Sequence, residues 1–131
     1  MLRTLIVEDE FTSRMILNTL LLRLGHCDTA VNGKEAIDAF AAALKEGTGY
    51  HLVCLDITMP GMDGHAVLKE IREMERAAGL GSSQGVKVIM TTAHDQGSIA
   101  GASRSKCDAF LLKPIAKTAL MSKLSELGLL A

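Results

Sequence analysis

The segment HLVCLDITMPGMDG, residues 51–64, decides the fold that the sequence predicts. Its first part, residues 51–55, is a short apolar run, which is typical of a buried strand. Asp56 directly extends that run, and residues 59–64 contain the proline and glycines of a loop. A carboxylate that continues a buried strand is seldom only a surface charge. Asp56 is therefore the first candidate for chemistry.

Other short apolar runs lie on both sides of this segment and alternate with stretches of helical periodicity. We expect strands at residues 4–7, 27–31, 51–55, 86–90 and 109–112. We expect helices between residue 7 and about residue 24, from the cap Asn32 to the stop at 47–49, around 67–74, at 95–106 and at 115–127. Apolar strands that alternate with helices predict an α/β fold, a doubly wound parallel sheet of five strands and five helices.

The composition indicates one globular domain spanning residues 1–131, with 48% hydrophobic and 22% charged residues. No linker is visible in the sequence, so we expect no output domain. A formal net charge of −1 argues against direct nucleic-acid binding and against a polybasic membrane anchor. No apolar run approaches the roughly 20 residues of a membrane span. The acidic residues 8–10 interrupt any signal peptide, and three cysteines without CxxC spacing argue against disulfides, so we expect a cytoplasmic protein.

Polar side chains follow the ends of most of the predicted strands. They are Glu8, Asp9 and Glu10 after the first strand, Asp56 after the third, Thr91 and Thr92 at the fourth, and Lys113 after the fifth. Ligands of open parallel sheets bind beyond the carboxyl ends of the strands. Any one of these residues could be a solvated loop residue, but together they predict a site at that edge.

The residue types in this set suit phosphate chemistry. Carboxylates held close together raise a pKa or require a cation. Oxygen ligands without histidine or cysteine partners suit Mg²⁺, while a lysine and a hydroxyl can hold phosphoryl oxygens. A carboxylate is ionised at pH 7 and can attack phosphorus without an activating histidine. The set predicts metal-assisted phosphoryl transfer onto an aspartate.

Four segments, taken in order, resemble the receiver domain of two-component response regulators. They are LIVEDE at residues 5–10, LDITMPGMDG at 55–64, MTTA at 90–93 and FLLKP at 110–114. The resemblance covers nearly the whole chain. It implies a flavodoxin-like fold with the strand order 2-1-3-4-5, for which the chemotaxis member of this family is a standard example.

The resemblance implies roles for the acidic residues and the lysine. Asp56 matches the phosphoacceptor. Glu8, Asp9 and Asp56, with the backbone carbonyl of Thr58, match the positions that hold Mg²⁺, for which Mn²⁺ is an expected substitute. Lys113 matches the lysine that contacts the phosphoryl group.

The resemblance also implies a switch. Thr92 matches the switch hydroxyl, Ala93 keeps the next position small, and Phe110 matches the aromatic switch residue. Pro114 matches a proline that follows a cis peptide bond. These assignments imply that phosphorylation at the sheet edge changes the surface near Phe110.

The expected function is that of a phosphorylation-activated signalling protein, not an enzyme beyond its own phosphorylation and dephosphorylation. A sensor histidine kinase or a histidine phosphotransfer protein would donate the phosphoryl group. A downstream protein would bind the face formed by residues 95–106, the fifth strand and the last helix. The protein would be a monomer or a phosphorylation-dependent dimer, without nucleic-acid or membrane partners.

Two departures and two alternatives accompany this interpretation. Lys106 and Cys107 replace a Gly-Ala pair that is usual in receivers, and the connection at 79–85 is longer than in many of them. One alternative is a phosphohydrolase of the haloacid-dehalogenase type, although its D-x-D motif after the first strand is missing here. The other is a receiver-like interaction module that works without phosphorylation.

Overall fold

A computed structural model of the chain describes residues 1–80, 85–93 and 107–130. Its strands form one parallel sheet in the order β2-β1-β3-β4-β5. Their bounds are β1 (Leu2–Val7), β2 (Gly25–Ala30), β3 (Leu52–Asp56), β4 (Lys87–Thr92) and β5 (Ala109–Leu112). The predicted α/β fold, its five parallel strands and the strand order are confirmed.

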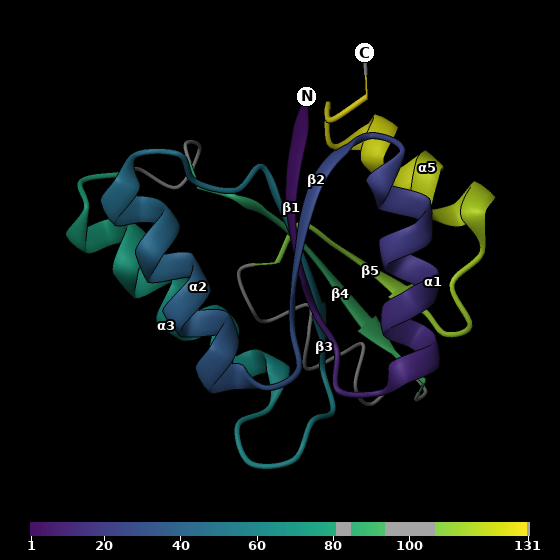
Figure 1. Cartoon of the computed structure of the whole chain (residues 1–131), viewed down its shortest axis with the longest axis horizontal. Coiled ribbons are helices and arrows are strands. Elements are labelled where there is room, and N and C mark those ends of the chain that lie inside the picture. Colours follow the sequence, from purple (N-terminus) through teal and green to yellow (C-terminus); the bar gives the residue numbers. More distant parts are fainter. Residues whose placement is uncertain (81–84, 94–106, 131) are drawn as a thin grey trace.

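Helices cover both faces of the sheet. In Figure 1, α1 (Phe11–Leu22) and α5 (Lys117–Glu126) lie on one side of the strands, and α2 (Gly33–Glu46) and α3 (Gly64–Ala77) lie on the other. The described residues contain these four helices, and the helix expected at 95–106 falls outside them. No helix among the described residues combines the length and the apolar character that crossing a membrane requires.

Several element bounds differ from the predicted ones, and hydrogen bonds account for the shifts. β4 continues through Thr92 instead of ending at residue 90, because Asp56 pairs in register with Thr91. α1 ends at residue 22 rather than 24, where a turn closes with Leu24 N donating to the Leu21 carbonyl at 2.9 Å. α3 begins at Gly64, earlier than expected, because the Asp63 side chain caps its first turn. α5 is shorter than predicted at both ends.

The caps of α2 agree with the sequence prediction. The Asn32 side chain accepts a hydrogen bond from Glu35 N at 2.8 Å, and Glu35 in turn accepts one from Val31 N at 2.9 Å. At the other end Gly47 has φ 77°, a left-handed conformation that favours glycine. The sequence signals at both ends of this helix were sufficient to place it.

Side chains alternate along each strand, so the core has two layers. Val53 and Leu55 face the layer under α2 and α3, whose largest fully buried side chain is Phe40. Leu52 and Cys54 face the layer under α1 and α5. By the same alternation, Asp56 continues the α1/α5 side of β3.

The end of β3 is packed tightly against the start of α3. A Cβ at Gly64 would lie 2.4 Å from the backbone oxygen of Asp56, so only glycine fits there. Gly64 N also donates to the Ile57 carbonyl at 2.8 Å. The glycine thus holds the loop that follows Asp56 against the sheet edge.

Candidate functional site

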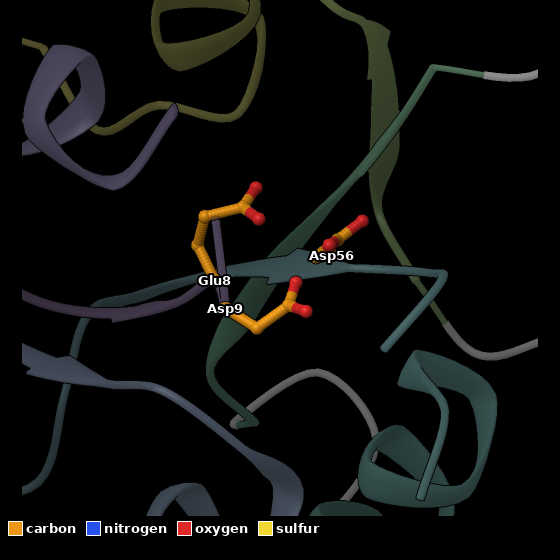
Figure 2. A group of neighbouring side chains, drawn as sticks. All are labelled: Glu8, Asp9 and Asp56. Carbon is orange, nitrogen blue, oxygen red and sulfur yellow. The ribbon is translucent and has the colours of Figure 1, made fainter. Parts of the chain in front are cut away.

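Three carboxylates meet where β1 and β3 end. These strands are neighbours, with Val7 opposite Leu55, so the residues that follow them lie side by side. Glu8, Asp9 and Asp56 each offer a carboxylate oxygen, and these oxygens lie within 4.8 Å of one another. Figure 2 shows the three side chains turned toward a common space. Glu8 and Asp56 are buried, whereas Asp9 is exposed.

Lys113 supplies positive charge to this cluster from the far side of β4. Its Nζ lies 2.6 Å from Glu8 Oε1 and 3.3 Å from Asp56 Oδ1. Because β4 lies between β3 and β5, the lysine side chain must pass over β4 to reach both acids. One ammonium group therefore serves two buried carboxylates.

The protonation of Asp56 reflects this shortage of positive charge. Burial and, next, the nearby charge of Glu8 raise the pKa of Asp56 to about 7, and Lys113 only partly opposes them. Burial alone would lower the pKa of Lys113, but its hydrogen bond with Glu8 and the charge of Asp56 raise it. The lysine stays charged while the aspartate is poised between its two states at neutral pH.

The donor set fits a hard divalent cation. Carboxylate oxygens are the ligands that Mg²⁺ prefers, and one or two of them usually suffice because the ion keeps several waters. Asp9 is exposed and carries an oxygen close to that of Asp56, so both can serve an ion that remains partly hydrated. Added positive charge would also relieve the repulsion between Glu8 and Asp56.

Glu10 belongs to the same acidic run but has a different, structural role. Its carboxylate accepts hydrogen bonds from Thr12 N at 2.7 Å, and from Ser13 N and the Ser13 hydroxyl at 3.0 Å each. These backbone bonds lower the pKa of Glu10. Glu10 is thus the N-cap of α1 rather than a fourth member of the cluster. The sequence hint was its place directly before the helix.

The remaining predicted residues lie in or next to β3, β4 and β5. Thr58 is exposed, and its N–H donates to Asp56 Oδ1 at 3.3 Å. Thr92 is fully buried, and its carbonyl accepts from Lys113 N at 2.8 Å. Phe110 is half-buried against the α2/α3 layer, and the Lys113–Pro114 peptide bond is cis. Ala93 is exposed.

Two hollows adjoin the site. One of about 420 Å³ opens beside Lys113, between the start of α1 and the β5–α5 connection. The other, of about 320 Å³, lies on the outer surface of α1, and both are lined by Thr12 and Ile16. Phe11 and Met15 line the second hollow and are 61% and 51% exposed, an apolar surface that the sequence analysis did not identify.

Of the two departures from the usual receiver pattern, only Cys107 and the ends of the 79–85 connection lie among the described residues. Cys107 is partly buried and packs against the α2/α3 layer of the core. Burial raises the pKa of its thiol. Lys106 and most of the 79–85 connection lie outside the described residues.

Comparison with known proteins identifies close relatives. A family model described as the response regulator receiver domain matches residues 4–125. The sensory/regulatory protein RpfC of Xanthomonas campestris pv. campestris is 31% identical over 128 residues, which cover 97% of this chain but 16% of that protein. The chain thus spans a small part of that curated relative.

Solved structures resemble the chain along nearly its whole length. A co-crystal structure of the Saccharomyces cerevisiae histidine phosphotransfer signalling protein Ypd1 with the receiver domain of Ssk1 contains a similar chain. That chain has a TM-score of 0.80 and 30% identity, over 95% of this chain and 87% of its own. The response regulator TrrA of Thermotoga maritima, in complex with Mg²⁺ and BeF, has a TM-score of 0.76 and 33% identity, over 97% and 99% of the two chains.

Proposed function

The chain belongs to the response regulator receiver domain family, and we propose that it is a signalling switch that accepts a phosphoryl group on Asp56. One observation carries the proposal. The buried Asp56 carboxylate lies beside an acidic pair that suits Mg²⁺ and 3.3 Å from the Lys113 ammonium. This arrangement supplies a nucleophile, charge neutralisation and a contact for phosphoryl oxygens at one point.

In the proposed reaction an Asp56 carboxylate oxygen attacks the phosphorus of a phosphohistidine. A P–O bond to Asp56 forms as the donor's P–N bond breaks, and the bonding electron pair leaves with the imidazole, which takes a proton from solvent. The acceptor must be ionised, and a pKa of about 7 leaves a substantial ionised fraction at neutral pH. Charge brought by a cation increases that fraction.

Asp9 and Asp56, with Glu8 behind them, would hold Mg²⁺, and we expect Mn²⁺ to substitute. When bound, the ion neutralises charge on the transferring phosphoryl oxygens. Lys113 contributes from the other side. Its ammonium leaves Glu8 and Asp56, 2.6 Å and 3.3 Å away, and contacts a phosphoryl oxygen. The lysine thus neutralises charge on the phosphoryl group, and its ion pairs with Glu8 and Asp56 become weaker.

The output of the switch runs through Thr92 and Phe110. In the β4–β5 register Met90 lies opposite Phe110, and Thr92, two residues further along, continues the same side of β4. A hydroxyl that moves toward a phosphoryl group on Asp56 would leave room on that side for the ring of Phe110. The ring is only half-buried and can turn inward.

The donor is a sensor histidine kinase or a histidine phosphotransfer protein. The yeast Ssk1 receiver was solved with such a phosphotransfer protein, Ypd1. In this chain the exposed apolar side chains Phe11 and Met15 lie on α1, next to the hollow beside Lys113. A protein donor that packs on this part of α1 could present its phosphohistidine to Asp56.

The test is transfer of labelled phosphoryl from a phosphorylated histidine phosphotransfer protein, with Mg²⁺ and with a chelator. The chain should gain label only with Mg²⁺, and Asp56→Asn should gain none. Met15→Lys should slow transfer from the protein donor but not from a small acyl phosphate. Leu22→Lys, at the 53% exposed residue at the far end of the same helix, is the matched control and should slow neither. Equal transfer to Asp56→Asn would contradict the proposal.

The two alternatives are less consistent with these features. A haloacid-dehalogenase-type hydrolase places its nucleophile after the first strand, whereas here Asp56 ends β3. An interaction module that works without phosphorylation would not need two buried carboxylates to share one lysine. The family match is to a receiver domain and not to a hydrolase.

A further inference from the structure

Thr91 buries a hydroxyl that has no hydrogen-bond partner among the described residues. The residue is fully buried in β4, and its Oγ1 accepts and donates no bond within the part of the chain that the structure covers. A buried hydroxyl without a partner is unfavourable, and valine has almost the same shape without that penalty. A threonine at this position therefore suggests a partner that the described residues, as they are arranged here, do not provide.

The strand register places this hydroxyl beside the acceptor. Thr91 lies opposite Asp56 on β3 and opposite Leu111 on β5. Residues paired in a parallel sheet direct their side chains to the same face. Leu111 belongs to the α1/α5 layer, and Asp56 continues that side of β3, so Thr91 lies between them on this side. The neighbouring Thr92 points to the opposite face and belongs to the switch.

The Lys113 side chain passes over this part of β4. It starts after β5 and ends 3.3 Å from Asp56 Oδ1, and Thr91 is the β4 residue in register with Asp56. In the state described here the ammonium and the Thr58 N–H both contact Oδ1. When the ammonium turns to a phosphoryl oxygen, Asp56 loses its charged donor. The Thr91 hydroxyl is then the buried donor next to it in the sheet.

We propose that Thr91 is a positioning residue for phosphoryl transfer, whose hydroxyl donates a hydrogen bond to the Asp56 carboxylate once Lys113 engages the phosphoryl group. The inference rests on the proposed function and adds a residue to it. Thr91 forms and breaks no covalent bond. It holds the plane of the carboxylate so that one oxygen faces phosphorus while the other stays turned into the sheet.

The sheet offers a matched control. Thr4 in β1 is also buried, and its Oγ1 likewise has no partner among the described residues. Thr4 alternates with Ile6 onto the same face of the sheet, but it pairs with Leu52, four residues before Asp56. Thr4→Val therefore makes the same chemical change at the same burial and on the same side, away from the acceptor.

The experiment measures the rate of phosphorylation by acetyl phosphate with Mg²⁺ for wild type, Thr91→Val, Thr91→Ser and Thr4→Val. Loss of one hydrogen bond that forms in the transition state corresponds to about a tenfold slower rate, which we expect for Thr91→Val. Thr91→Ser keeps the hydroxyl and should restore the rate to near the wild-type value, and Thr4→Val should not slow it. The carbon-13 shift of the Asp56 carboxyl in the beryllofluoride-bound state should change in Thr91→Val and not in Thr4→Val.

Each outcome separates the inference from a structural role. Equal rates for wild type and Thr91→Val would overturn the inference and leave the proposed function intact. Equal slowing in Thr91→Val and Thr91→Ser would assign the residue to packing and overturn it too. No labelling of wild type would contradict the proposed function itself. If Thr91→Val does not fold, the phosphorylation rate and the Asp56 carboxyl shift of Thr91→Ser decide. Because this variant keeps the hydroxyl, values that differ from those of wild type contradict the inference.

Discussion

The two ends of the same parallel sheet both hold carboxylates, yet these groups are paired differently at each end. At the amino end Glu75, only 4% exposed, accepts from Val86 N at 2.6 Å and from Arg72 at 2.9 Å. Asp108 accepts from Val88 N at 2.8 Å and from the same guanidinium at 3.3 Å. At the carboxyl end Glu8 and Asp56 share one lysine.

This difference separates a structural set of charges from a functional one. Carboxylates at both ends accept a backbone N–H, but at the amino end each also has its own arm of a planar guanidinium, so the charges fix α3 to the starts of β4 and β5. At the carboxyl end the acids repel one another, and the pKa of Asp56 is raised. We therefore expect a cation that binds at this end to stabilise the protein. We call these two sets the amino-edge network (Arg72, Glu75, Asp108) and the carboxyl-edge cluster (Glu8, Asp9, Asp56, Lys113).

The largest expected effect is at the amino-edge network. Glu75→Ala removes the buried acceptor of Val86 N and one acceptor of Arg72 Nη1, which keeps its bond to the Val86 carbonyl at 2.8 Å, and the free energy of unfolding should fall by about 4 kcal/mol. Glu73→Ala, at an exposed position on the same helix, should change it little. Chemical denaturation measures both. Glu75→Ala protein that remains folded should still be phosphorylated, and loss of phosphorylation in folded protein would contradict the separation of the two ends.

At the carboxyl-edge cluster a charge-removing substitution should stabilise the protein. Asp56→Asn removes a carboxylate whose ionised form is disfavoured by about 1.4 kcal/mol for each pKa unit, and the buried amide keeps part of the desolvation cost, so we expect a net gain of about 2 kcal/mol at pH 8. The folded chain holds a proton on Asp56 up to a pKa of about 7, whereas the unfolded chain loses it near 3.8. Wild-type stability should therefore fall as the pH rises between these values.

The measurement is thermal unfolding of wild type and Asp56→Asn from pH 4 to pH 8 without divalent cations. The amount by which the thermal midpoint of Asp56→Asn exceeds that of wild type should be small at pH 4 and greatest at pH 8. An Asp56→Asn protein that is less stable than wild type at pH 8 would show that the cluster is as well satisfied as the amino-edge network.

Much of this comparison could be predicted from the sequence, but not all. Apolar runs and caps such as Asn32 located the strands and helices, and strand-end positions brought Glu8, Asp56 and Lys113 together. The amino-edge network was not predicted, because Arg72 and Asp108 are far apart in sequence and only β4–β5 pairing brings them together. Glu10 was grouped with its neighbours, since a one-dimensional pattern does not show which way a side chain turns.

A smaller effect should come from magnesium. Mg²⁺ at tenfold excess over its dissociation constant should stabilise the folded protein by about 1.4 kcal/mol, because it binds only the folded state. Asp9→Ala should reduce the rise in the thermal midpoint. Asp108→Asn, at the amino-edge network, should show the full rise from its own lower starting midpoint. No Mg²⁺-dependent rise at millimolar concentrations would contradict the metal assignment.

The smallest effect should come from Glu10. It follows Glu8 and Asp9 in the sequence, but its carboxylate accepts the N-cap hydrogen bonds of α1. Glu10→Gln should lower the thermal midpoint slightly and leave the Mg²⁺ response at the wild-type value. Because the backbone bonds lower its pKa, its contribution is present above the usual carboxyl range and is lost as the pH falls. A weakened Mg²⁺ response would place Glu10 in the cluster instead.

The most direct test of the central claim, that the carboxyl-edge cluster carries the chemistry, is the intact mass of the protein after incubation with Mg²⁺ and acetyl phosphate. Wild type and Asp108→Asn should each gain the mass of one phosphoryl group, and Asp56→Asn should gain none. A phosphoryl group on Asp56→Asn, or its absence from wild type, would contradict the account.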